Sequence, residues 1–166
     1  ASLVGSEMCI RDRSHLAIIV SFQSLILGMS GNVGTQSLAV TIRVLMDEDL
    51  SGRQKWGLIF KEARIGFCNG LMLGLLAFAF IGTYVYVLKG RPLQYAFSVS
   101  ACAGVALMLA MTISSVVGTV VPMFFHKVKV DPAVASGPLI STVNDFVAVV
   151  TYYGLAWVLL IHVLHL

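Results

Sequence analysis

Charged residues are scarce in this sequence. Only 11% of its 166 residues are Asp, Glu, Lys or Arg, whereas soluble domains carry about 25%. Hydrophobic residues make up 58% of the chain, and the mean hydropathy is +0.90. The net charge of +3 is small, and we expect no nucleic-acid partner. The composition therefore excludes an ordinary soluble domain and predicts an all-α bundle of membrane-spanning helices.

The motifs of common enzymes and metal sites are missing. The three cysteines, Cys9, Cys68 and Cys102, have no disulfide or metal spacing, and no CxxC, HExxH or Walker-type loop occurs. An intramembrane aspartyl protease needs two carboxylates that share a proton, and we expect the interior of the spans to offer Asp145 alone. A serine protease needs an activated nucleophile, and no His lies at membrane depth near Ser141. We therefore expect that the protein is not an enzyme.

Four long apolar segments remain, over residues 16–45, 62–88, 93–125 and 133–166. Each is long enough to cross a bilayer as a helix, which takes about 20 residues. A tight turn at 89–92 separates the second segment from the third. Asp131 followed by Pro132 is typical of a helix N-cap with Pro at the first helical position. The predicted fold is a polytopic helical bundle with about four spans.

Residues 1–13 differ from everything that follows. They are polar, lack a start Met and have no apolar core of a signal peptide. They resemble read-through of a sequencing adapter, so we set them aside as a non-native leader. We expect residues 14–166 to be the membrane domain, and the natural protein to continue upstream.

A Gly-rich polar stretch interrupts the first apolar segment at residues 28–36. One helix over residues 16–45 would be about 45 Å long, which is too long for an untilted span. Such interruptions are typical of broken helices that line a binding site. We therefore predict a break in this span, with carbonyl groups freed around Gly31–Gly34. The alternative is a flexible glycine kink or a loop between two short segments.

Small and hydroxyl residues recur in the middle spans. Gly66, Gly70 and Gly74 lie on one face of the second span, a pattern that lets helices pack closely. In the third span we expect hydroxyls to bond the carbonyl four residues back; these are Thr112, Ser114, Ser115 and Thr119. We expect Pro122 to kink or end that helix.

Asp145 is the only carboxylate in the last apolar segment. A carboxylate within a membrane span is costly unless it meets a cation, a cavity or a partner. Pro138 cannot bond the carbonyl of Val134, and Ser141 lies on the same helix face as Asp145. A free carbonyl, a hydroxyl and a carboxylate suit a hard cation or its water shell. The alternative is that Asp145 and Asn144 only hydrogen-bond a neighbouring helix.

Two motifs in this order resemble the MgtE magnesium transporters. The segment Gly31-Asn32-Val33-Gly34-Thr35-Gln36 is similar to the family's GNxGTQ motif, and residues 131–145 are similar to the start of its last helix. The resemblance implies a five-helix membrane domain that works as a homodimer, of which this chain supplies helices two to five. It implies that the first helix and the cytoplasmic regulatory domains are absent, and that a pore on the dimer axis holds Asp145 at its ion site.

The candidate metal-site residues are therefore Asp145, Gly31, Asn32, Gly34, Thr35, Gly137, Ser141 and Asn144. Two copies would bring two Asp145 carboxylates to one largely hydrated Mg²⁺, the transported ion, in a membrane-embedded homodimer. Entry would be passive and driven by the membrane potential. The positive-inside rule places residues 43–64 in the cytoplasm of an inner-membrane protein, with the C-terminus outside.

Two other readings stay open. One is a transporter of another divalent metal such as Mn²⁺, Co²⁺ or Zn²⁺; softer metals favour His and Cys ligands, and none lies near Asp145. The other is a non-conducting membrane scaffold. A pore requires the Gly31–Gly34 stretch and Asp145 to converge in space, whereas a scaffold does not.

Overall fold

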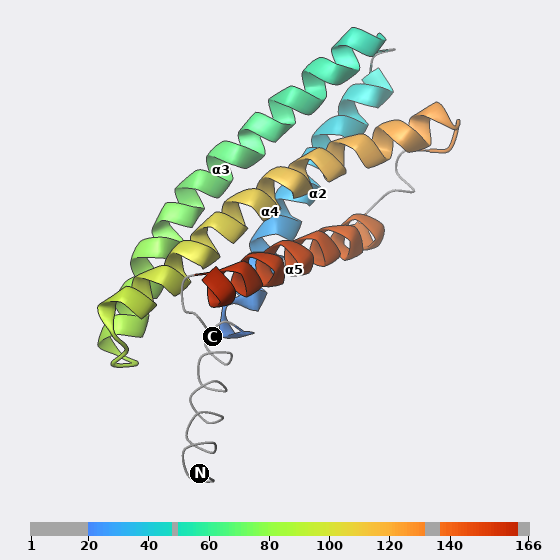
Figure 1. Ribbon diagram of the computed structural model, residues 1–166. Helices are drawn as coiled ribbons and strands as arrows, with labels where there is room; N and C mark the ends of the chain where they lie inside the picture. Colours follow the sequence, from blue (N-terminus) through green and yellow to red (C-terminus); the bar gives the residue numbers. More distant parts are fainter. Residues whose placement is uncertain (1–19, 48–49, 132–136, 163–166) are drawn as a thin grey trace.

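The computed structural model describes residues 20–47, 50–131 and 137–162. In these ranges the chain forms helices and no strands, which confirms the predicted all-α bundle. The helices are α2 (Gln23–Asp47), α3 (Gly52–Val87), α4 (Leu93–Lys127) and α5 (Gly137–His162), shown in Figure 1. The leader at 1–13 and the Asp131–Pro132 N-cap prediction fall wholly or partly outside these ranges.

Three of the described helices are long and apolar enough to cross a membrane. They are α3, α4 and the part of α5 over Pro138–Val158. The first predicted span, now α2, is not among them, and its middle third is rich in glycine and polar residues. The bundle is therefore a membrane domain in which one helix is too polar to face lipid along its whole length.

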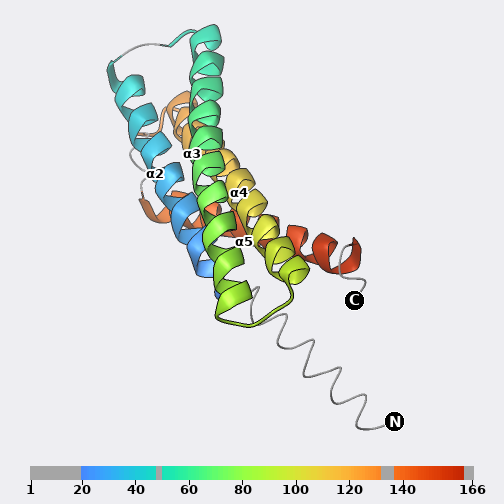
Figure 2. The same cartoon turned by 90° about the vertical axis from the view of Figure 1, so that its left-hand side faces the viewer.

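Helix α4 lies at the centre of the bundle. It packs along α3 on one side and against α2 and α5 on the other, while α2 and α3 touch each other little. Figures 1 and 2 show α5 crossing the bundle beside α2 and α4, away from α3. The core is apolar; its largest fully buried side chains include Ile26, Val99, Leu107, Met111 and Tyr152. The predicted 89–92 turn is present, and Gly90 takes a left-handed backbone with φ of 59° that favours glycine.

Glycines let α3 and α4 approach until their backbones touch. A Cβ atom added to Gly70 would lie 2.8 Å from the Met108 Cα, and one on Gly74 would lie 2.7 Å from the Gly104 carbonyl oxygen. A Cβ on Gly66 would likewise lie 2.6 Å from that of Ser115. The predicted packing role of the glycine stripe is therefore confirmed.

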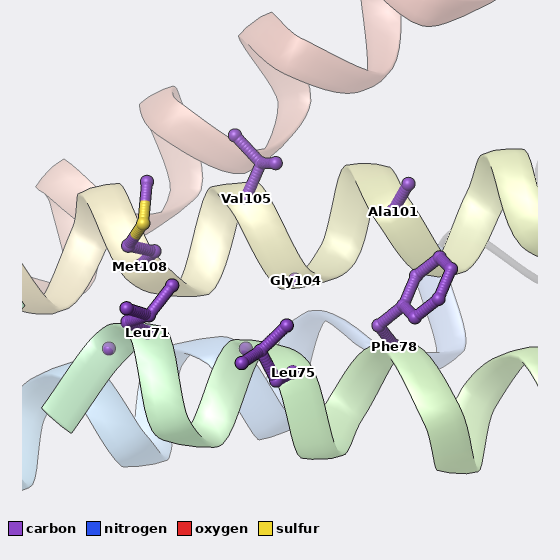
Figure 3. Close-up of a pocket in the computed structure, with 9 residues that line it drawn as sticks. Leu71, Leu75, Phe78, Ala101, Gly104, Val105 and Met108 are labelled. Atoms are coloured by element: carbon purple, nitrogen blue, oxygen red, sulfur yellow. The ribbon is translucent and has the colours of Figure 1, made fainter. Parts of the chain in front are cut away.

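An apolar groove of about 270 Å³ runs beside this contact. Figure 3 shows side chains of both helices around it, among them Leu71, Leu75 and Phe78 from α3 and Val105 and Met108 from α4. Its lining is suited to the hydrocarbon of a membrane and offers no polar group for an ion.

The predicted break in the first span is wrong. Helix α2 runs without interruption through residues 28–36, so the carbonyls around Gly31–Gly34 stay in the helix. Thr35 adds a bond that ties its hydroxyl to the Gly31 carbonyl at 3.1 Å and the Asn32 carbonyl at 2.9 Å. Glycine lowers helix propensity by only about 1 kcal/mol, which packing against other helices outweighs.

Two predicted boundaries also need correction. Helix α3 begins at Gly52 rather than at residue 62, and the Ser51 backbone N–H donates to the Gln54 side chain at 2.8 Å at its start. Helix α4 continues past Pro122 to Lys127, so Pro122 does not end it. Proline removes one hydrogen bond from a helix interior, and Pro122 is buried where neighbouring helices support the backbone.

The four hydroxyls predicted for the third span divide into three cases. Thr112 and Thr119 donate to the carbonyls four residues back, at 2.7 Å and 2.9 Å, as predicted. Ser115 instead donates across to the backbone carbonyl of Glu62 on α3, at 2.5 Å. The Ser114 hydroxyl is buried without a hydrogen-bond partner. The surroundings of Ser115 and Ser114 depend on how the helices pack, which the periodicity of the sequence does not reveal.

Candidate functional site

Gly34 marks the point where three helices cross. It is buried on α2, and its carbonyl oxygen lies so close to Gly118 of α4 that no side chain would fit there. A Cβ atom on Gly34 itself would lie 2.8 Å from the Asn144 Cγ of α5 and closer still to its amide nitrogen. The glycine motif of α2 therefore serves close approach to α4 and α5, not a break in the helix.

Asn144 of α5 is buried at this crossing. Its side chain is 0% exposed, and neither its amide nitrogen nor its amide oxygen has a hydrogen-bond partner. A buried polar group left unpaired costs about 1–3 kcal/mol. In this arrangement the amide faces Gly34, so Asn144 joins the two motif-bearing helices.

The remaining motif residues of α2 point in other directions. Asn32 lines a cavity of about 290 Å³ between α2 and α3, together with Gln36 and Asn69. Asn32 and Gly34 lie two residues apart, which is about 200° around a helix, so they cannot share a face. Nothing lies within 4 Å of a Cβ added to Gly31, so that position is open.

Asp145 lies on the outer side of α5. It is exposed, and Ser141 one turn earlier is half-buried. Pro138 is exposed as well, and its carbonyl accepts a bond of 2.8 Å from the Thr142 hydroxyl. Gly137 is the first residue of α5, and the predicted free carbonyl of Val134 lies outside the described residues.

The two motifs therefore converge, but through a different residue from the one predicted. Asn144, not Asp145, touches Gly34. Asp145 is the next residue along α5, about 100° further round the helix, where the single chain leaves it uncovered. Further along α5, Tyr152 is 1% exposed and belongs to the apolar core.

The described part of the chain contains no group of three or more His, Cys, Asp or Glu residues that could hold a metal ion. A site built by one copy alone would thus rest on a single carboxylate with neutral oxygens. Sequence reasoning missed one buried carboxylate, Glu62, which is 4% exposed. Its position one turn before Gly66, on the packing face of α3, was the available signal.

Comparison with known proteins decides the family. Residues 23–155 match MgtE, a family described as divalent cation transporters. The chain belongs to the MgtE family. Its membrane-spanning helices, together with this membership, make it an integral membrane protein.

Three curated MgtE proteins, each named a magnesium transporter, are similar to this chain. The Bacillus subtilis protein is 38% identical over 142 residues, which cover 86% of this chain and 30% of the relative. The Enterococcus faecalis protein is 36% identical over 157 residues, covering 94% and 32%. The Thermus thermophilus protein is 33% identical over 159 residues, covering 95% and 32%. The chain thus spans about a third of the length of these MgtE proteins.

Proposed function

We propose that this chain forms the ion-conducting membrane part of a Mg²⁺ channel that works as a homodimer. In this proposal α2 and α5 line a pore on the dimer axis, and the Asp145 carboxylates of the two copies hold the ion. Family membership supports divalent cation transport, and the names of the relatives support Mg²⁺ as the ion.

The exposed position of Asp145 carries this proposal. It lies on the segment Pro138–Val158, which is apolar enough to span a membrane, about 10 Å from the start of that segment. A carboxylate at that depth cannot face lipid without a cost of several kcal/mol. Because the single chain leaves Asp145 uncovered, a second copy or a water-filled path has to cover it.

The chemistry of Mg²⁺ suits two carboxylates better than one. A single Asp145 cannot balance a divalent charge, whereas two related by a dimer axis can. Mg²⁺ keeps most of its water shell, so the half-buried Ser141 oxygen and nearby carbonyls would contact waters, not the ion itself. In this proposal Asp145 is the charged ligand. The contact between Asn144 and Gly34 fixes the position of α5 against α2 and thereby orients Asp145.

Charge along the chain supports passive inward movement. Five basic residues lie between positions 43 and 64. Two more, Lys127 and Lys129, lie at the end of α4 and just after it, whereas only Lys89 and Arg91 lie at the opposite turn. The positive-inside rule places the first two groups in the cytoplasm of an inner membrane and the C-terminus outside. An inside-negative potential then favours entry of a divalent ion by about 4.6 kcal/mol per 100 mV.

Ion uptake tests the site. The full-length protein is expressed in cells that lack their own magnesium transporters, beside Asp145→Asn and Asp145→Ala. We expect the parent to restore growth at low Mg²⁺, and both variants to lose uptake by at least about tenfold while still assembling. Asp131→Asn, which removes an exposed carboxylate before α5, is the matched control and should retain uptake.

The outcomes separate the competing functions. Uptake by Asp145→Ala equal to that of the parent would refute the ion site. Uptake of Mn²⁺ or Co²⁺ with no uptake of Mg²⁺ would favour a different divalent metal. An assembled parent that moves none of these ions would favour a non-conducting scaffold.

Disulfide cross-linking tests the dimer. Phe146 is next to Asp145 and is 69% exposed, so Phe146→Cys should form a cross-linked dimer once the native cysteines are replaced by serine. Phe80 is 74% exposed on the outer side of α3, and Phe80→Cys is the control that should stay monomeric. Equal cross-linking at both positions, or cross-linking at Phe80 alone, would argue against an α5-centred dimer axis.

A further inference from the structure

The start of α3 lies beyond the part of that helix that can cross the hydrocarbon. Residues 65–88 carry no charged side chain, and at 1.5 Å per residue they measure about 36 Å, which covers a hydrocarbon core of about 30 Å. Arg64 is the last charged residue before this stretch. Figures 1 and 2 show that the start of α3 also reaches past the end of α4. Residues 52–64 therefore lie at the level of the lipid headgroups and beyond it.

Two large aromatic side chains are exposed in this segment. Trp56 is 65% exposed and Phe60 is 72% exposed, and they lie four residues apart on one face of α3. Exposed large apolar side chains that lie together mark protein or membrane interaction sites. Trp is also enriched where a membrane meets water, because its ring is amphipathic. This face of α3 is therefore suited to the interface of the bilayer.

Two basic side chains lie beside these rings. Lys61 and Arg64 are both exposed and three residues apart, so they are neighbours on the helix surface. In the part of the chain that the structure describes, neither of them forms a hydrogen bond or an ion pair. Their charges are therefore available to an anion from outside the chain. We call these four residues the interfacial patch: Trp56, Phe60, Lys61 and Arg64.

The acidic residue of this segment does not neutralise the interfacial patch. Glu62 is the only acidic residue of α3; it is 4% exposed, and its backbone carbonyl accepts a bond from Ser115 of α4. Phe60 and Arg64 each lie two positions from Glu62, which is about 200° around a helix. The interfacial patch therefore lies on the side of α3 away from α4, where lipid surrounds the helix.

The same face continues into the hydrocarbon as exposed apolar side chains. Phe67 and Leu71 follow Arg64 by three and seven positions, a spacing that keeps residues on one helix face, and they are 44% and 43% exposed. Leu71 also lines the apolar groove between α3 and α4, which begins at Gly70, about 10 Å past Arg64 (Figure 3). A lipid with its phosphate at Arg64 would thus have this groove within reach of an acyl chain.

We propose that the interfacial patch binds the phosphate of an anionic phospholipid, with one acyl chain along the groove between α3 and α4. The Arg64 guanidinium can hold a phosphate by two parallel hydrogen bonds, and Lys61 adds a point charge beside it. Two basic side chains at the headgroups attract a lipid of net negative charge, whereas a zwitterionic lipid also carries a positive group. Trp56 and Phe60 hold this end of α3 at the interface. The proposal does not depend on whether the protein conducts Mg²⁺.

Thermal unfolding of the full-length protein tests the proposal. The protein is purified in a neutral detergent and supplemented with phosphatidylglycerol or with phosphatidylcholine of the same acyl chains. We expect phosphatidylglycerol to raise the unfolding midpoint by roughly 2–4 °C more than phosphatidylcholine does. Raising the salt concentration to about 1 M should reduce this difference, because salt screens charges at an exposed surface.

A matched pair of double variants locates the binding site. Lys61→Gln with Arg64→Gln changes only exposed side chains and should unfold at the same temperature in the two lipids. The control is Arg53→Gln with Lys55→Gln, which removes the same charge from the same helix but on average about 13 Å further from the hydrocarbon. It should keep the preference for phosphatidylglycerol. Native mass spectrometry should likewise show fewer phosphatidylglycerol molecules on the Lys61 and Arg64 variant than on this control.

Three results would overturn the proposal. Equal midpoints for the parent in both lipids would mean that the interfacial patch has no preference for an anionic headgroup. An equal loss of preference in both double variants would indicate attraction by overall charge without a site. A midpoint lowered equally in both lipids by the Lys61 and Arg64 changes would indicate that these side chains bind an acidic part of the protein instead of a lipid.

Discussion

The two carboxylates within the bundle, Asp145 and Glu62, have opposite surroundings. Asp145 is exposed on the outer side of α5, beside a crossing where Gly34 and Asn144 exclude everything else. Glu62 is buried at a second crossing, that of α3 and α4, where its backbone carbonyl accepts a bond from the Ser115 hydroxyl. An exposed carboxylate in a span requires a partner or water from outside the chain. A buried carboxylate requires a hydrogen-bond donor or a cation inside the bundle. The difference teaches that one bundle can hold carboxylates in two distinct environments.

Filling the first crossing should have the largest effect. Gly34→Ala places a methyl group against the Asn144 amide, so one helix must move. We expect a loss of about 3 kcal/mol in stability and little assembled protein, measured by unfolding in detergent. Parent-like stability would mean that the Gly34–Asn144 contact is loose in the membrane.

A double variant, Gly34→Ala with Asn144→Ala, tests whether these two residues limit each other. Asn144→Ala removes the amide that blocks Gly34, and it also removes an unpaired buried group. Combined with Gly34→Ala it should recover about 1–3 kcal/mol relative to the sum of the single effects. Simple additivity in the unfolding measurements would argue that Gly118, not Asn144, limits the space at Gly34.

Breaking the second crossing should have a smaller effect. Ser115→Ala removes the bond to the Glu62 carbonyl and the partner of Ser37, for an expected loss of about 1–2 kcal/mol. The same unfolding assay checks this, and a stability equal to that of the parent would mean that the two bonds contribute little in the membrane domain.

A glycine outside both crossings should matter least. Nothing lies within 4 Å of a Cβ added to Gly28, so Gly28→Ala only raises helix propensity, by at most about 1 kcal/mol. We expect a small gain in the unfolding midpoint, in contrast to the large loss at Gly34 six residues later. A marked loss at Gly28 would indicate that a further partner occupies that open side of α2.

Much of the fold follows from local patterns in the sequence. Apolar length predicted the helices, and the spacing of Gly66, Gly70 and Gly74 predicted the α3–α4 contact. The glycines of α2 were misread because the same residue type either interrupts a helix or lets another helix approach. Only the neighbours of Gly34 distinguish the two, and they come from α4 and α5, over 80 residues away in sequence.

The candidate site could be predicted only in part. Sequence singled out Asp145 and the glycine motif, because a lone carboxylate in an apolar segment is conspicuous. It could not tell that Asn144 would contact Gly34 or that Asn32 would line a cavity with α3. Helix rotation sets these directions, and rotation depends on packing with all neighbours at once.

The sequence by itself determined that this protein is a helical membrane bundle of the MgtE type, since hydrocarbon tolerates only helices whose backbone groups bond internally. It also singled out Asp145 as the one carboxylate of the last apolar segment. Only the tertiary structure decided that Asp145 is exposed while Glu62 is buried, and that the Ser37 and Ser115 hydroxyls meet between α2 and α4. The reason is physical: burial depends on which helices cross, and hydroxyl donors are committed only once those helices meet.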